Sequence, residues 1–138
     1  MARILLVDDE EDIARTLQLM LEHYGFDVDA FTDPAMALQK FKPKSYDLMI
    51  LDIKMAEING FELYDKLTSR DSNIKTLFIT ALNQVEPYNT RNMKVYPLKG
   101  IRHFIKKPVG NDDLLRQVCS LLTDKNVYQI GEDVYQIG

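Results

Sequence analysis

Short apolar runs alternate along this chain with longer segments in which apolar residues recur at helical spacing. The first run, residues 3–7, is too short for a helix and is apolar on both faces, which is typical of a central strand in a parallel sheet. The segment that follows, residues 10–24, places its apolar residues on one helical face, and Gly25 is a suitable stop. The same pattern predicts further strands at 27–31, 46–51, 75–80 and 102–105.

Helix signals fall between these strands. Asp33 and Asn59 are predicted to cap two helices, and residues 111–122 carry the apolar spacing of the last one. The segment 82–100 is ambiguous, because two prolines bracket a weakly helical middle. We expect a short or irregular helix there.

Five strands that alternate with helices predict an α/β fold: a single doubly wound, five-stranded parallel sheet with helices on both faces. In the flavodoxin-like strand order 2-1-3-4-5, strands 1 and 3 are neighbours, and ligands bind beyond the carboxyl ends of the strands. This order brings Asp8 and Asp9 beside Asp52. Thr80 ends the fourth strand and Lys107 follows the fifth, so both reach the same edge of the sheet.

These residue types suit phosphoryl chemistry. A carboxylate can attack a phosphoryl group and hold it as an acyl phosphate. Crowded carboxylates such as Asp8, Asp9 and Asp52 repel each other unless a hard cation such as Mg²⁺ neutralises them. Lys107 supplies a cation for a phosphoryl oxygen and Thr80 supplies a hydroxyl.

Taken one at a time, these residues have plainer explanations. Acids are common at helix starts, a lone lysine is usually a solvated surface residue, and Thr80 and Phe104 would pass as ordinary strand or core residues. The five-residue constellation at one sheet edge is what favours a site.

Composition narrows the function further. The chain has 138 residues, of which 46% are hydrophobic and 28% charged, as in an ordinary soluble globular domain. A net charge of -4 without a long basic run argues against direct nucleic-acid binding. Cys119 is the one cysteine, so an internal disulfide is excluded and a reducing cytoplasm is favoured. The apolar stretches are too short to span a membrane.

The end of the chain repeats itself. The pentapeptide at 127–131, Val-Tyr-Gln-Ile-Gly, recurs at 134–138. We therefore divide the chain into a domain at 1–124 and a tail at 125–138. The tail either pairs as a small hairpin, adds to a sheet edge, or frays.

Together the motifs resemble the receiver domain of response regulators in two-component signalling. The resemblance runs from about residue 3 to residue 122, with the motifs in family order after the expected strands. The matching segments are Val7-Asp8-Asp9-Glu10, Leu51-Asp52-Ile53-Lys54-Met55 with Gly60 downstream, Ile79-Thr80-Ala81, and Phe104 with Lys107-Pro108.

The resemblance implies a phosphorylation switch. A sensor histidine kinase would transfer a phosphoryl group to Asp52, and Thr80 and Lys107 would contact that group. Phe104 and Thr80 would be the switch residues. The chain would act as a cytoplasmic regulator that catalyses only its own phosphoryl transfer and dephosphorylation, and not as an enzyme of other substrates.

The resemblance also implies the metal ligands and the output. Mg²⁺ would be bound directly by Asp9 and mainly through water by Asp8, and Asp52 and the backbone carbonyl of Lys54 would complete the protein ligands. Output would pass through the face formed by the fourth helix, the fifth strand and the last helix. This face would bind an unidentified downstream protein or a second copy of the chain as a homodimer.

Details of the last strand and its loop matter for this assignment. Lys107 is the better candidate than Lys106, because it directly precedes Pro108 and because alternation along a strand sends Lys106 to the other side. The Lys107–Pro108 peptide bond is cis in the family.

Two departures from the family pattern keep an alternative open. Ala56 stands where proline is common, and the segment between Thr80 and Lys107 is longer and more polar than usual. The alternative is a receiver-like interaction module that works without phosphorylation. A haloacid-dehalogenase-type phosphatase fits less well, since it needs Asp-x-Asp after the first strand and the chain has Asp8-Asp9-Glu10 there.

Overall fold

The computed structural model describes residues 2–81, 104–122, 127–130 and 133–136. Five parallel strands form one sheet in the order β2-β1-β3-β4-β5, as predicted. The strands are β1 (Arg3–Val7), β2 (Asp27–Phe31), β3 (Leu48–Asp52), β4 (Lys75–Thr80) and β5 (Phe104–Lys106). The helices are α1 (Glu11–His23), α2 (Pro34–Lys40), α3 (Gly60–Thr68) and α4 (Asn111–Leu122).

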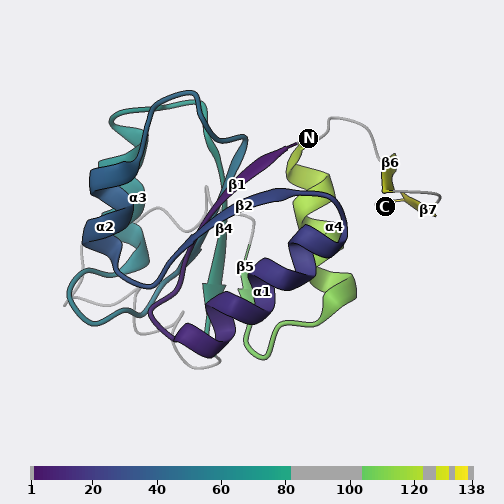
Figure 1. The fold of residues 1–138 in the computed structure, drawn as a ribbon, viewed down its shortest axis with the longest axis horizontal. Helices are drawn as coiled ribbons and strands as arrows, with labels where there is room; N and C mark the ends of the chain where they lie inside the picture. Colours follow the sequence, from purple (N-terminus) through teal and green to yellow (C-terminus); the bar gives the residue numbers. More distant parts are fainter. Residues whose placement is uncertain (1, 82–103, 123–126, 131–132, 137–138) are drawn as a thin grey trace.

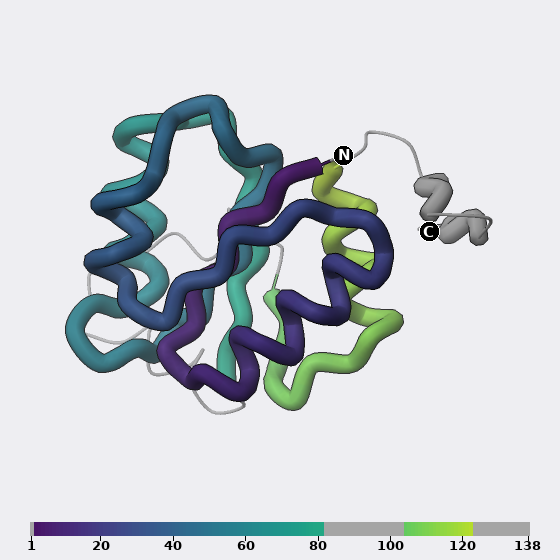
Figure 2. The backbone as a smooth tube through the Cα atoms, viewed as in Figure 1, coloured from purple at the N-terminus to yellow at the C-terminus, as the bar shows by residue number. Residues whose placement is uncertain are grey.

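The helices lie in two layers, one on each face of the sheet (Figure 1). Figure 2 shows the same arrangement in the backbone trace, with α2 and α3 on one flank and α1 and α4 on the other. Two apolar clusters fill the spaces between the layers. One joins side chains such as Leu17 of α1 and Val118 of α4 to Ile50 of β3, and the other joins Phe61 of α3 to Leu51 of β3. A strand that is buried on both faces needs apolar residues at every position, which explains the unbroken runs in the sequence.

Local signals place the helix ends close to where the sequence predicts them. Asp33 caps α2 by accepting a hydrogen bond from the Ala35 amide at 2.9 Å. Asn59 and Glu62 form a reciprocal capping box at the start of α3. Gly25 follows α1 with a φ of 95°, a conformation that glycine adopts at low cost.

Strand β3 differs from the prediction at both ends. The sequence pattern predicts a strand at 46–51, and the structure has Leu48–Asp52. The backbone amide of Arg3 donates to the Asp47 carboxylate at 2.8 Å, so a side chain takes the place of a strand carbonyl there and the ladder with β1 begins at Leu48. At the other end, Asp52 pairs with Ile79 and is the last residue of the strand.

Some predictions fall outside the described residues. The short or irregular helix expected at 82–100 lies there, and so do residues 102 and 103 of the predicted fifth strand. Within the tail, β6 (Val127–Ile130) and β7 (Asp133–Gln136) pair antiparallel, with Tyr128 opposite Tyr135. No helix in the described part of the chain is long and apolar enough to cross a membrane.

Candidate functional site

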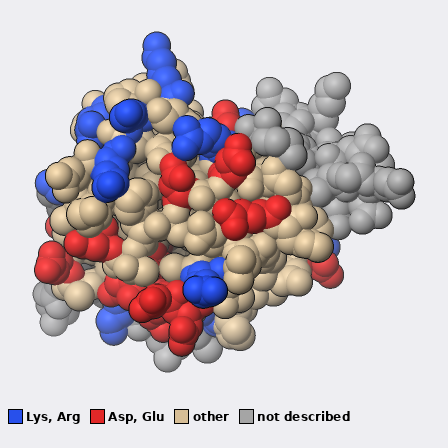
Figure 3. All heavy atoms as spheres, viewed as in Figure 1, with Lys and Arg blue, Asp and Glu red and all other residues tan. Residues whose placement is uncertain are grey.

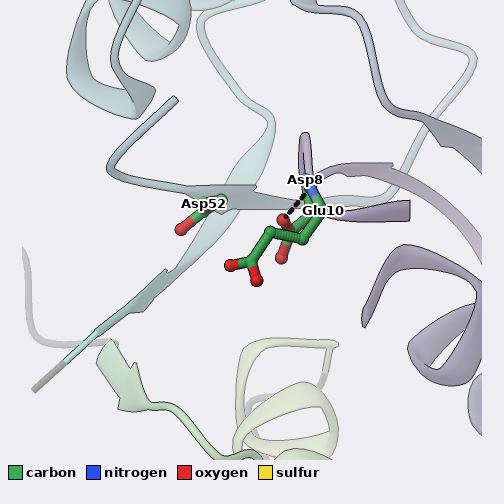
Figure 4. A group of neighbouring side chains, drawn as sticks. All are labelled: Asp8, Glu10 and Asp52. Atoms are coloured by element: carbon green, nitrogen blue, oxygen red, sulfur yellow. Dashed lines mark hydrogen bonds between the residues drawn. The ribbon is translucent and has the colours of Figure 1, made fainter. Parts of the chain in front are cut away.

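The carboxyl ends of three strands converge on one polar cluster. Asp8 follows β1 directly, Asp52 ends β3, and Lys107 follows β5. Strands β1 and β3 are paired neighbours, with Val7 opposite Leu51, which sets the two acids side by side. Figure 4 shows Asp8 and Glu10 leaving the end of β1 beside Asp52 at the end of β3. Strand order alone therefore assembles these residues from distant parts of the sequence.

Lys107 lies among three carboxylates. Its Nζ is 2.7 Å from Glu10 Oε1, 3.1 Å from Asp8 Oδ2 and 3.4 Å from Asp52 Oδ2. Asp8 is fully buried and Asp52 is 2% exposed, whereas the Glu10 side chain is 59% exposed. Acidic side chains gather on the surface over the start of α1 (Figure 3). One cation therefore faces three acids, so the cluster is only partly neutralised.

Burial and mutual repulsion shift the protonation of this cluster. Burial, together with the negative charge of Asp8, raises the pKa of Asp52 to about 7, although Lys107 opposes the shift. Burial also raises the pKa of Asp8, against the Glu10 amide, which donates to Asp8 Oδ1 at 2.9 Å, and against Lys107. Burial lowers the pKa of Lys107, but the ion pairs with Glu10, Asp52 and Asp8 outweigh it and raise the pKa above its usual value.

The donor set fits a hard divalent cation. Asp8, Glu10 and Asp52 each offer a carboxylate oxygen, and these oxygens lie within 4.8 Å of one another. Asp8 Oδ2 is buried and has no hydrogen-bond partner within the described ranges. Mg²⁺ and Ca²⁺ bind carboxylate oxygens, and a divalent charge would relieve the repulsion between the acids.

Other predicted site residues lie at the ends of β1, β3 and β5, around the cluster. The carboxylate of Asp9 accepts a hydrogen bond from the Ala56 amide at 3.1 Å, in the loop after β3. Lys54, in the same loop, is exposed. Of the two neighbouring lysines, Lys107 points into the cluster and Lys106 is exposed. The peptide bond between Lys107 and Pro108 is cis.

Thr80 ends β4, and Phe104 begins β5, the edge strand that pairs with it. Thr80 is fully buried, and its Oγ1 donates to the Ala81 carbonyl at 3.0 Å. The Thr80 carbonyl accepts from the Lys107 amide at 2.8 Å, which ties β4 to the residue after β5. Phe104 is half-buried and stacks on Phe78 with ring centroids 5.8 Å apart.

Gly60 fixes the position of the strand end that carries Asp52. Its amide donates to the Ile53 carbonyl at 2.7 Å. A Cβ at this position would lie 2.3 Å from the Asp52 carbonyl oxygen, so only glycine allows α3 to begin so close to β3. The tight contact holds the backbone of Asp52 in place.

Glu10 is the one member of the cluster to which the sequence argument gave no role. An exposed acid just before a helix is usually explained by the helix dipole, so the sequence offers no separate reason to assign Glu10 to the site. A signal was present nonetheless. Alternation along an extended chain sends residues 8 and 10 to the same side, and Glu10 has extended backbone angles before α1.

Comparisons with known proteins agree on one family. A sequence model described as a response regulator receiver domain matches residues 4–119. The response regulator ArlR of Staphylococcus epidermidis is 34% identical over 134 residues, which cover 94% of this chain and 58% of that protein. The response regulator SaeR of Staphylococcus aureus is 30% identical over 129 residues, covering 93% and 54%. The chain thus spans about half the length of the curated relatives it matches.

Solved structures give the same picture. The response regulator TrrA of Thermotoga maritima, in complex with Mg²⁺ and BeF, is 30% identical with a TM-score of 0.72 and covers 88% of this chain and 100% of that one. The non-phosphorylated HemR receiver domain of Leptospira biflexa is 25% identical with a TM-score of 0.75, covering 94% and 100%.

Proposed function

This chain belongs to the response regulator receiver domain family, and we propose that it accepts a phosphoryl group on Asp52 from a sensor histidine kinase. The observation that carries the proposal is the buried position of Asp52 at the end of β3, between a second acid and a lysine. In that position Asp52 offers a nucleophilic oxygen. Lys107 supplies a cation for the incoming phosphoryl group, and Asp8 supplies a second carboxylate for metal binding.

In the proposed reaction a carboxylate oxygen of Asp52 attacks the phosphorus of a phosphohistidine. The new bond is P–O, the bond that breaks is P–N, and the histidine nitrogen leaves with its electron pair. Lys107, 3.4 Å from Asp52 in the resting state, is placed to contact a phosphoryl oxygen. The hydroxyl of Thr80 would turn away from the Ala81 carbonyl and donate a hydrogen bond to a second phosphoryl oxygen.

A divalent metal belongs to the proposal. Asp8, Asp9 and Asp52 and the carbonyl of Lys54 would hold Mg²⁺. The carboxylate oxygens of Asp8 and Asp52, which lie within 4.8 Å of each other, support such an ion. When bound, Mg²⁺ supplies positive charge that keeps Asp52 ionised and neutralises the phosphoryl oxygens. The complex of TrrA with Mg²⁺ and BeF supports this assignment by analogy.

The proposal also covers how phosphorylation would change the binding surface of the domain. Movement of Thr80 towards the phosphoryl group would leave space for Phe104 to turn inward from its stack on Phe78. That change would alter the face that includes β5 and α4, where a downstream protein or a second copy of the chain would bind. The domain would act in the cytoplasm, as a regulator that modifies only itself.

Mass spectrometry after incubation with acetyl phosphate and Mg²⁺ tests the proposal. We expect a phosphoryl adduct on the wild-type chain, its loss in Asp52→Ala, and an undiminished adduct in Asp27→Asn, a change of an exposed acid at the start of β2. No adduct on the wild type, or an equal adduct on Asp52→Ala, would instead favour a receiver-like interaction module that works without phosphorylation.

A further inference from the structure

The shortest contact of Lys107 is with the exposed acid of the cluster and not with either buried one. Among the described residues, its Nζ donates to Glu10 Oε1 at 2.7 Å. Asp8 Oδ2 lies 3.1 Å from the same nitrogen, yet this buried oxygen has no hydrogen-bond partner in the described part of the chain. The lysine therefore makes its closest contact with an exposed carboxylate, although two buried ones lie within reach.

The backbone holds Glu10 where it can do this. Its amide donates to Asp8 Oδ1, and its carbonyl accepts from the Ala14 amide at the start of α1. These two bonds fix the main chain of Glu10 between the end of β1 and the first turn of α1. The side chain reaches from that fixed point across the opening of the cluster to Lys107.

A lysine ammonium group has three donors, and three carboxylates already lie within 3.4 Å of this one. A phosphoryl group on Asp52 would bring a further acceptor. Metal binding would neutralise Asp8, and phosphorylation would convert Asp52 to an acyl phosphate. In the proposed ligand set, which uses Asp8, Asp9 and Asp52, Glu10 keeps its charge and remains the competitor for the lysine.

We propose that Glu10 is a positioning residue that restrains Lys107 in the unphosphorylated domain, so that Glu10 and the phosphoryl group compete for the same ammonium group. This proposal rests on the proposed function for its consequence, since the competition matters only if Asp52 carries a phosphoryl group. The restraint itself is a property of the metal-free protein and is tested separately below.

Calorimetric titration with beryllofluoride, a phosphoryl mimic, at saturating Mg²⁺ measures the competition. We expect Glu10→Gln to bind the mimic about threefold to fivefold more tightly than the wild type, the range expected for an ion pair with one exposed partner. Saturating Mg²⁺ removes any effect of this variant on metal affinity.

Glu11→Gln is the matched control. Glu11 is the next residue along the chain, is exposed, and forms no ion pair in the described part of the chain, so this change removes one negative charge near the cluster without releasing Lys107. We expect its effect on mimic binding to stay below about twofold. Equal effects of Glu10→Gln and Glu11→Gln would overturn the proposal, because general electrostatics would then suffice. Weaker binding by Glu10→Gln would overturn it too, because Glu10 would then assist binding of the mimic and not compete with it.

A double-mutant cycle with Lys107→Met on thermal unfolding in EDTA tests the restraint without metal or mimic. With Lys107 present, Glu10→Gln should lower the melting temperature, because an ion pair is lost. With Lys107→Met, the same change should raise the melting temperature, because only repulsion with Asp8 and Asp52 remains to be relieved. Equal shifts in the two backgrounds would overturn the proposal.

The two experiments separate the proposal from the function on which it rests. A wild-type protein that binds no beryllofluoride would contradict the proposed function, and the unfolding cycle would still decide whether Glu10 holds Lys107.

Discussion

The two ends of the parallel sheet both carry charged networks, and they differ in how completely the acids are satisfied. At the amino end, Arg3 donates to Asp29 at 2.9 Å, and the Tyr46 hydroxyl donates to the same carboxylate oxygen at 2.6 Å. Arg3 and Asp29 are 48% and 43% exposed. At the carboxyl end, Lys107 faces two acids that are almost fully buried.

The difference separates a structural network from a site. Acids at the amino end have hydrogen-bond donors and access to water, so this network is stable without any ligand. Acids at the carboxyl end outnumber their cation, and one buried oxygen of Asp8 has no hydrogen bond within the described residues. A fold that buries charge without satisfying it is destabilised unless a ligand completes the set, which makes incomplete satisfaction the better marker of function.

The largest effect should come from the glycine that fixes the carboxyl end. Gly60→Ala places a Cβ 2.3 Å from the Asp52 carbonyl oxygen, and the contact is with backbone that cannot turn aside. We expect a loss of about 3 kcal/mol in the free energy of unfolding by overpacking. Urea denaturation measures it.

Gly110→Ala is the matched control for that change, because a Cβ there meets nothing within 4 Å. It lies in the loop before α4, at the same end of the sheet. We expect a change of less than about 0.5 kcal/mol. A similar loss in both variants would mean that the carboxyl end is not held by the contact between Gly60 and β3.

Removal of the cation from each end compares the two networks directly. Lys107→Met leaves buried acids without a counter-charge, and we expect a loss of about 2–3 kcal/mol in EDTA at neutral pH, limited because Asp52 can take up a proton. Arg3→Met removes an exposed ion pair and should cost no more than about 1 kcal/mol. Chemical denaturation of both variants in one buffer is the measurement, and equal losses would remove the distinction between the two ends.

The sequence predicts those features of the two sheet ends that follow from local patterns and from strand order. The apolar runs predict β1, β2 and β4 with the bounds that the structure has, because strands buried on both faces leave a continuous signal. The parallel order then places Asp8, Asp52, Thr80 and Lys107 at one edge. Local patterns and topology are sufficient for that much.

Side-chain partners across loops are the part that the sequence does not predict. Asp9 contacts the Ala56 amide and Glu10 contacts Lys107, and each pair is separated by dozens of residues. Such partners depend on where a loop passes and on which rotamer a long side chain adopts. The start of β3 differs from the sequence prediction for the same reason, since the Asp47 carboxylate accepts a hydrogen bond from the amide of Arg3, which is 44 residues away in the sequence.

The third effect is a dependence of stability on pH that arises at the carboxyl end. The pKa of Asp52 is raised in the folded state from its ordinary value of 3.8 to about 7, so between those values the folded protein binds more protons than the unfolded chain. The free energy of unfolding should therefore fall by about 2 kcal/mol as the pH rises from about 5 to 7 in EDTA. Thermal or urea unfolding across this range measures the slope.

Asp52→Asn should flatten that slope, because the titrating group is gone, whereas Asp29→Asn at the amino end should leave it unchanged. A stability that stays constant from pH 5 to 7 in the wild-type protein would contradict a protonated carboxyl cluster. If Asp29→Asn flattened the slope equally, the pH dependence would not be specific to the carboxyl end of the sheet.

The smallest effect should come from Tyr46→Phe at the amino end. The change removes the hydroxyl that donates to Asp29 and keeps the ring, over which the Arg3 guanidinium lies at 5.3 Å. Asp29 keeps its bond to Arg3 and has access to water, so we expect a loss of about 0.5–1 kcal/mol. Burial and the hydrogen bond to Asp29 raise the pKa of Tyr46 from 10 to about 12, so this loss should be the same at every pH from 5 to 9. Urea unfolding of the wild type and the variant at pH 5, 7 and 9 is the measurement. A loss that grows or shrinks across this range would show that the amino end also carries a group that titrates between pH 5 and 9. The two ends would then differ in degree and not in kind.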